Sequence, residues 1–281
     1  MQILYICGVW GLEELPLEVK LKKIKQAGFD GVEIGMPVDN KELKLLKALL
    51  KDLDLSLVAQ ILTTGSSPKE HISSYEEQFK RSSGLNPVIV NSHTGKDFYS
   101  TEENISILKA AAKLEGRYGI KAVHEIHRGR ATFSINSTMA LLKNFPELKL
   151  TADFSHWCCV HESLLEDQQE SMDKAIEISH HIHARVGHAE GPQVSDPRAP
   201  EWKHNVDVHF GWWQSIVDHH LKIGNKFLTV CPEFGPPAYM PVLPYTRQPV
   251  ADQWELNTYM LETLQQRLRT KKEKGDKLPP L

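Results

Sequence analysis

Cysteine is scarce in this chain and unevenly spaced. The 281 residues include four cysteines, at positions 7, 158, 159 and 231. Two are adjacent and two stand alone, so the sequence lacks the paired CxxC spacing of a thiolate zinc site. It also lacks the even cysteine framework of a small secreted protein held by disulfides. We interpret the four thiols as reduced residues of a core.

Long runs of one charge or of apolar residues are also missing. The formal net charge is -3 without an acidic or basic block, which argues against a nucleic-acid partner. The opening residues MQILYICGVWG lack a positive leader and a cleavage signal, and their apolar run is too short to span a bilayer. The sequence therefore predicts a soluble, cytoplasmic protein without a membrane partner. The basic stretch 267–277 runs into LPPL, and we expect 271–281 to form a flexible tail.

Short apolar runs alternate with amphipathic stretches along the whole chain. Strands are predicted at 3–7, 30–35, 55–62, 87–93, 120–126, 147–154, 180–186 and 226–234. Helical patterns follow them, the later ones near 137–145, 165–179, 212–223 and 251–270. Eight such units without a linker favour an α/β fold with a single closed (β/α)8 TIM barrel over 1–281, rather than an open doubly wound sheet. A GxGxxG motif after the first strand, typical of dinucleotide-binding sheets, is missing.

Polar residues gather where the later predicted strands end. Glu125, Asp153, His183 and Glu233 hold the same relative place on four consecutive strands. A closed barrel places the ends of its strands around one mouth, where the active sites of such barrels lie. Taken alone, each carboxylate is explained as the cap of the next helix, and the histidine as a packed residue of the core. Together the four side chains indicate a functional site, because they converge on one point.

Three carboxylates that converge repel one another and raise one another's pKa unless a cation lies between them. Three carboxylates and one imidazole suit a divalent metal ion, with Mn²⁺ favoured over Mg²⁺, Co²⁺ or Zn²⁺. The absence of thiolates from the set argues against a structural zinc ion. Four ligands also leave coordination positions open for substrate oxygen atoms. We therefore expect one catalytic metal ion per chain.

The motifs at the strand ends resemble those of a known superfamily. GFDGVEIG at the second strand, Glu125 at the fifth, DFSH at the sixth, HIHA at the seventh and PEF at the eighth are similar to xylose isomerase-like barrels. That group includes ketose 3-epimerases, hydroxypyruvate isomerase, inosose dehydratase and endonuclease IV. The resemblance covers the whole chain. It implies a metal held by Glu125, Asp153, His183 and Glu233, and substrate binding by His156, three residues after the aspartate.

Two features differ from the sugar epimerases of this group. Those enzymes place an arginine six residues after the metal-binding histidine, and Ala189 occupies that position here. Arg185 and Arg198 are the candidates to replace it. The stretch 186–211 is also long for a connection after a strand, which favours a lid or a specificity loop. The substrate of the known epimerases therefore does not carry over.

Other polar and aromatic residues near the strand ends are candidates for substrate contact. Besides His156 they are Arg185, His93, His127, Trp10 and Trp157. His188 and His209 are candidates for a secondary metal or a substrate contact. The tryptophans either pack on the barrel or form an apolar platform for the C–H face of a sugar ring.

The predicted chemistry is proton transfer at a carbon next to a carbonyl. By resemblance, Glu125 and Glu233 remove and return the proton through an enediolate. The same intermediate gives epimerisation, aldose–ketose isomerisation or, with a leaving group, elimination by a lyase, and the sequence does not choose among them. We expect an unphosphorylated sugar or keto-sugar, since the loop after the last strand is rich in proline and has no basic residue before Arg247.

Two other classes of protein stay open. His93 and the DVH motif at 207–209 are similar to ligands of endonuclease IV, which makes a phosphodiesterase the second class. Against it, Gln60 stands at the end of the third strand, where that enzyme has a histidine, and the negative net charge is unfavourable for binding DNA. A non-catalytic sugar-binding barrel is disfavoured because the ligand-type residues are present at all four strand ends. A homodimer and a homotetramer both remain compatible with the sequence.

Overall fold

Eight parallel strands close into a barrel in the order β1 to β8. The structure, a computed structural model, describes residues 1–270, and the predicted tail 271–281 lies outside them. The strands are β1 (Gln2–Gly8), β2 (Gly31–Gly35), β3 (Ser56–Leu62), β4 (Ile89–His93), β5 (Ala122–Glu125), β6 (Leu150–Ala152), β7 (Ser179–Ala184) and β8 (Phe227–Pro232). Because β1 pairs with both β2 and β8, the sheet has no open edge. The predicted (β/α)8 barrel is confirmed.

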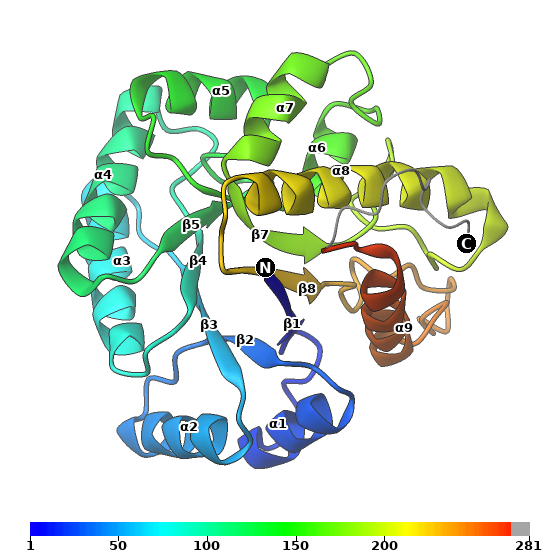
Figure 1. Cartoon of the computed structure of the whole chain (residues 1–281), viewed down its shortest axis with the longest axis horizontal. Coiled ribbons are helices and arrows are strands. Elements are labelled where there is room, and N and C mark those ends of the chain that lie inside the picture. Colours follow the sequence, from blue (N-terminus) through cyan, green and yellow to red (C-terminus); the bar gives the residue numbers. More distant parts are fainter. Residues whose placement is uncertain (271–281) are drawn as a thin grey trace.

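Helices surround the strands on the outside of the barrel (Figure 1). They are α1 (Leu17–Gln26), α2 (Asn40–Asp52), α3 (Pro68–Ser83), α4 (Thr101–Tyr118), α5 (Ile135–Asn144), α6 (Phe154–Val160), α7 (Gln169–Glu177), η1 (Pro200–Trp202), α8 (Lys203–Lys222) and α9 (Gln253–Arg267). Local signals start several of them: Ser100 and Glu103 form a capping box at α4, and the Asp39 carboxylate caps α2. Within residues 1–270, none of the helices is long and apolar enough to cross a membrane.

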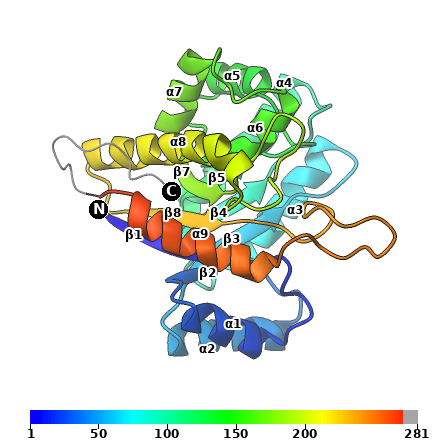
Figure 2. The ribbon, with the colours of Figure 1, turned by 90° about the vertical axis from the view of Figure 1, so that its right-hand side faces the viewer.

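The barrel interior changes from apolar to polar toward the carboxyl ends of the strands. An apolar layer is formed by Ile6, Val58, Ile89, Val123 and Cys231. Side chains alternate along a strand, so the residues two positions further on also point inward. These include Asn91, Glu125 and Glu233. The polar layer therefore lies directly above a packed floor, at the end from which the β8–α9 connection extends (Figure 2, orange).

Two segments differ from the prediction. The strand predicted at 147–154 ends at Ala152, and Phe154 begins the short helix α6. Helix α8 begins at Lys203, well before the predicted start at 212, and takes up the second part of the predicted loop 186–211. The reason is that Val206, Phe210 and Trp213 share one buried face at helical spacing.

A candidate metal centre and its cavity

Glu125, Asp153, His183 and Glu233, called here the ligand group, converge at the mouth of the barrel. One possible ligand atom from each lies within 4.8 Å of the others. Glu125 ends β5, Asp153 precedes α6, His183 lies in β7 and Glu233 follows β8. Asp153 and His183 are fully buried, and 12% of the Glu233 side chain is exposed. The topology thus brings together the residues that the sequence singled out.

Two atoms that face each other in the ligand group make no hydrogen bond within the described chain. They are His183 Nδ1 and Glu233 Oε2, which lie 2.9 Å apart. His183 Nδ1 also lies 3.6 Å from Glu125 Oε2. Buried polar atoms normally have partners. Donor atoms of one octahedral divalent ion lie about 2.1 Å from it and hence roughly 3 Å from each other. The spacing and the unsatisfied atoms fit a metal ion.

Glu33 in β2 holds His183 from the side opposite the ligand group. Its buried carboxylate lies 2.9 Å from His183 Nε2 and 3.0 Å from His181 Nε2. It also accepts a hydrogen bond of 2.7 Å from the Asn91 amide. A proton on Nε2 that is donated to a carboxylate leaves Nδ1 free as the ligand atom. Glu33 lies within the GFDGVEIG motif, but its role was not predicted from the sequence, although an acid within an apolar strand was the available signal.

Arg185 brings a buried cation into the ligand group. Its guanidinium forms a close ion pair with Asp153, lies 3.6 Å from Glu233 and donates to His156 Nε2 at 2.9 Å. It also lies 4.8 Å from the centre of the Tyr239 ring. Arg198, the other candidate for the missing family arginine, instead pairs with Asp196 at 2.7 Å. Of the two, only Arg185 reaches the site.

Burial and nearby charges oppose each other in setting the pKa values of Asp153, Glu125 and His183. Burial raises the pKa of Asp153 to about 7 against the opposing pull of Arg185. Burial also acts on Glu125, but His93 and His183 outweigh it and hold the pKa of Glu125 well below its usual range. Despite burial, Glu233 and Glu33 raise the pKa of His183 well above its usual value. His183 must therefore lose a proton when its Nδ1 binds a metal.

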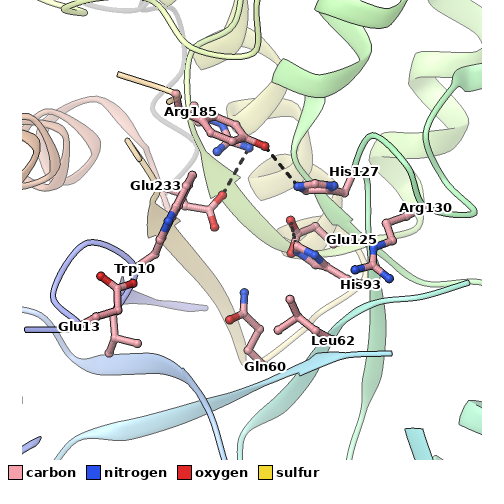
Figure 3. Close-up of a pocket in the computed structure, with 12 residues that line it drawn as sticks. Trp10, Glu13, Gln60, Leu62, His93, Glu125, His127, Arg130, Arg185 and Glu233 are labelled. Atoms are coloured by element: carbon pink, nitrogen blue, oxygen red, sulfur yellow. Dashed lines mark hydrogen bonds and ion pairs between the residues drawn. The ribbon is translucent and has the colours of Figure 1, made fainter. Parts of the chain in front are cut away.

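A cavity of about 470 Å³ opens beside the ligand group (Figure 3). It is lined by Val9, Trp10, Glu13, Gln60, Leu62, His93, Glu125, His127, Arg130, Arg185, Glu233 and Tyr239. His93 Nε2 lies 2.8 Å from Glu125 Oε1, and the His93 and His127 rings are 4.4 Å apart. Together with Glu125 these two histidines form a second cluster of possible metal ligands. The cavity thus gives a small polar molecule access to the carboxylates of Glu125 and Glu233.

Comparison with known proteins agrees with this geometry. The sequence pattern of the xylose isomerase-like TIM barrel family matches residues 21–228. The chain belongs to this family. None of the curated protein sequences matches the chain.

Solved structures share the fold of this xylose isomerase-like barrel over nearly its whole length. A D-tagatose 3-epimerase-like protein is 16% identical, with 94% of this chain and 97% of that chain covered and a TM-score of 0.64. The apo form of 3-keto-D-glucoside 4-epimerase YcjR from E. coli is 13% identical, with 94% and 99% covered and a TM-score of 0.62. The probable 3-DHS dehydratase AsbF from Bacillus anthracis is 13% identical, with 94% and 99% covered and a TM-score of 0.61. At these identities the similarity establishes the fold alone.

Two predicted substrate contacts of this xylose isomerase-like barrel lie behind the cavity wall. His156 is fully buried, and its Nδ1 and Nε2 lie 3.2 Å from Arg128 Nε and 2.9 Å from the Arg185 guanidinium. It therefore orients two arginines. Trp157 is also fully buried and donates to the Thr132 carbonyl at 3.0 Å. The prediction that Trp157 forms a platform for substrate is wrong, because the indole belongs to the core.

His188 and His209 lie on the β7–α8 side, away from the ligand group. His209 Nδ1 lies 2.8 Å from the Asn205 carbonyl, and its Nε2 accepts the Gly187 amide at 3.1 Å. Because both nitrogens are engaged, His209 holds α8 to the barrel, which corrects its predicted role as a secondary ligand. The His188 ring packs 4.9 Å from the Trp202 ring, within the connection that precedes α8. The predicted contacts that do line the cavity are Trp10, His93, His127 and Arg185.

Proposed function

We propose that this xylose isomerase-like barrel is a metal-dependent sugar isomerase or epimerase. It moves a proton at a carbon next to a carbonyl, through an enediolate of the substrate. One observation carries the proposal: Glu125 and Glu233 line the same cavity and flank His183 Nδ1 at 3.6 Å and 2.9 Å. A divalent ion held by the ligand group, with Mn²⁺ favoured, would polarise the carbonyl and stabilise the negative charge of the enediolate.

Glu233 is the better placed of the two carboxylates to remove the proton. Its Oε2 makes no hydrogen bond within residues 1–270, whereas Glu125 Oε2 accepts the Asn91 amide at 2.8 Å. A second proton, passed from His93 to Glu125 Oε1 over 2.8 Å, is then delivered from the Glu125 side of the cavity, while Glu233 keeps the proton that it removed and later releases it to solvent. Return to the opposite face of the same carbon gives an epimer, and return to the neighbouring carbon gives an isomer.

We infer that the substrate carries no phosphate. Arg198, in the connection before α8, and Lys203, the first residue of α8, are engaged by Asp196 at 2.7 Å and by Asp207 at 3.2 Å. The connection after β8 contributes Glu233 and Tyr239 to the cavity. The carboxylate of Glu13 also lines it and repels a phosphate dianion. The two guanidinium groups of the cavity are engaged as well, Arg185 by Asp153 and Arg130 by the Thr63 carbonyl at 3.0 Å. These charges favour a neutral sugar or keto-sugar.

A lyase acting on a keto-sugar or keto-glycoside is the second candidate. The same enediolate eliminates a group at the next carbon if a donor protonates the leaving oxygen. The Tyr239 hydroxyl lies in the cavity, 3.4 Å from His127 Nε2, and is such a donor. The product distinguishes this candidate from an isomerase, because elimination forms a carbon–carbon double bond.

A phosphodiesterase has less support. The DVH motif that suggested it does not face the cavity: Asp207 pairs with Lys203 and with Arg267, the latter at 2.9 Å. His209 is held by backbone groups of Gly187 and Asn205.

Exchange of the substrate α-proton for deuterium tests the proposed function. The Mn²⁺-loaded protein is incubated in D₂O with paired free and phosphorylated ketoses and keto-sugars, and NMR follows the label and the products. We expect metal-dependent exchange on unphosphorylated members, lost in Asp153→Ala. Absence of exchange on every member contradicts the proposal, and DNA nicking in a parallel assay would favour the phosphodiesterase. Faster exchange on a phosphorylated member contradicts the inference about phosphate.

A further inference from the structure

The cavity extends beyond the ligand group toward β1 and β3. Trp10 and Glu13 reach it from the β1–α1 connection, and Gln60 and Leu62 from the end of β3. We call this part the Trp10–Leu62 half. In Figure 3 these four side chains lie on the side of the cavity opposite Arg185 and His127. The volume of about 470 Å³ falls within the range of roughly 300–1,000 Å³ in which proteins bury small molecules and cofactors. A ring held at the ligand group leaves this half unfilled.

The Trp10 wall is fixed in place by its neighbours. The indole meets the Tyr239 ring edge-on, with 4.9 Å between the ring centres. A Cβ on Gly235 would lie 2.2 Å from the indole, so only glycine lets the ring lie against that backbone. The Gln253 amide donates to the carbonyls of Trp10 at 2.7 Å and of Phe234 at 2.9 Å, which joins the two loops. A preorganised aromatic surface loses little entropy when a ligand packs on it.

Leu62 and Gln60 complete this half with an apolar and a polar group. Leu62 is 41% exposed at the end of β3, so its apolar side chain is open to a ligand in the cavity. Its backbone is fixed, because the Gln78 side chain accepts from its amide at 3.4 Å and donates to its carbonyl at 2.9 Å. The Gln60 amide lines the cavity and makes no hydrogen bond to any other described residue. It has both a donor and an acceptor to offer to hydroxyl groups.

We propose that the Trp10–Leu62 half is a subsite for a second sugar ring, so that the substrate is a neutral glycoside of the disaccharide class. The C–H groups of a pyranose carry partial positive charge and pack on the negative face of an indole. Leu62 covers further apolar edges of the ring, while Gln60 and the Glu13 carboxylate bind its hydroxyls. This inference rests on the proposed function for the placement of the reacting ring, whose carbonyl lies at the ligand group.

Equilibrium binding tests the subsite without requiring turnover. Calorimetry with the Mn²⁺-loaded protein compares D-fructose with turanose, maltulose, isomaltulose and lactulose, and 3-ketoglucose with 3-ketomaltose. We expect at least one disaccharide to bind ten times more tightly than its own monosaccharide, a difference of about 1.4 kcal/mol. If none binds more tightly, the subsite is disproved. If disaccharides bind tightly but none exchanges its α-proton, the subsite stands and the proposed isomerase function fails.

Matched variants test whether Trp10 and Leu62 cause the preference for a disaccharide over its monosaccharide. Trp10→Ala and Leu62→Ala should each reduce the ratio of disaccharide to monosaccharide affinity at least fivefold. Phe98→Ala and Leu45→Ala remove exposed apolar side chains elsewhere and should leave the ratio unchanged. Gly235→Ala should reduce it by displacing the indole, while Gly116→Ala, where a Cβ meets open space, should not. Thermal melts establish that each variant is folded. A preference that survives in both Trp10→Ala and Leu62→Ala places the second ring elsewhere and overturns the assignment.

Discussion

Glu33 is buried between His181, His183 and Asn91. Its lowered pKa arises although burial opposes it, because the His183 charge and the hydrogen bond from His181 stabilise the carboxylate. Burying an ionised carboxylate costs free energy unless an opposite charge and hydrogen bonds compensate for the lost hydration. The partner here is His183, whose ring orientation decides whether Nδ1 points into the ligand group.

Glu33→Gln tests this orienting role. Gln preserves the shape of the side chain but removes the charge that fixes the His183 proton on Nε2. We expect the affinity for Mn²⁺ to fall about 10-fold to 100-fold, measured by calorimetry or by competition with a chelator. Glu18→Gln, which removes an exposed carboxylate of α1, serves as the control. An unchanged Mn²⁺ affinity in a folded Glu33→Gln protein contradicts the role.

Glu233→Gln separates proton transfer from metal binding. The amide oxygen of Gln still binds a metal, but it does not accept a proton at working pH. We expect turnover to fall by two or more orders of magnitude while most of the metal is retained, in contrast to Asp153→Ala, which should lose the metal. Metal analysis and the deuterium-exchange assay are run on the same samples. A rate near that of the wild type would show that Glu233 is only a ligand.

At the scale of elements, the order of the strands followed from the sequence and their ends did not. Buried parallel strands have continuous apolar runs, such as ILYIC in β1 and LVA in β3, so each is visible without its neighbours. Their ends depend on pairing: β6 stops at Ala152, and the next two residues turn into α6. Helix α8 was predicted too short because its apolar face becomes clear only when Val206 and Phe210 are counted with Trp213.

Phe210→Ala tests whether this face holds α8 to the barrel. The ring is fully buried, 4.9 Å from the Trp213 ring and 3.9 Å from the Arg267 guanidinium. Its removal leaves a cavity, and we expect the free energy of unfolding to fall by about 3–5 kcal/mol in urea titrations. Ser215→Ala alters an exposed position of the same helix and should change it by less than about 0.5 kcal/mol. Similar values for the two variants would show that the face is not essential.

At the scale of the whole molecule, the barrel topology explains why the ligand group was predictable and its surroundings were not. Four consecutive strands point their last inward residues at one mouth, so strand order alone brings the ligand group together. The contact from Glu33 to His183 spans 150 positions across the barrel, and the sequence gives no sign of its register. Tyr239 reaches the cavity from the connection after β8, and Gln60 reaches it from β3. Neither position could be predicted, because no pattern in the neighbouring residues specifies it.

Buried neutral histidines make the stability of the whole molecule depend on pH. Burial lowers the pKa of His124 to about 3, that of His180 to about 3 and that of His209 to about 4. In the unfolded chain the histidine pKa is about 6.5. Between about pH 4 and pH 6.5 these histidines therefore bind protons in the unfolded chain but not in the folded protein. The free energy of unfolding therefore falls as the pH drops below about 6.5.

His209→Gln isolates the contribution of one of these residues. His209 is not part of the ligand group, and its ring packs 4.8 Å from the Trp212 ring and 5.8 Å from the Trp213 ring. At pH 7.5 the variant should be less stable, because the hydrogen bonds to Gly187 and Asn205 are disturbed. At pH 4.5 the wild type has lost about 2 kcal/mol through His209 and the variant has not, so the difference between them should shrink by that amount. Urea titrations at the two pH values measure it. A difference that stays constant would mean that His209 is already protonated in the folded protein at pH 4.5, and that α8 tolerates a charge against its two tryptophans.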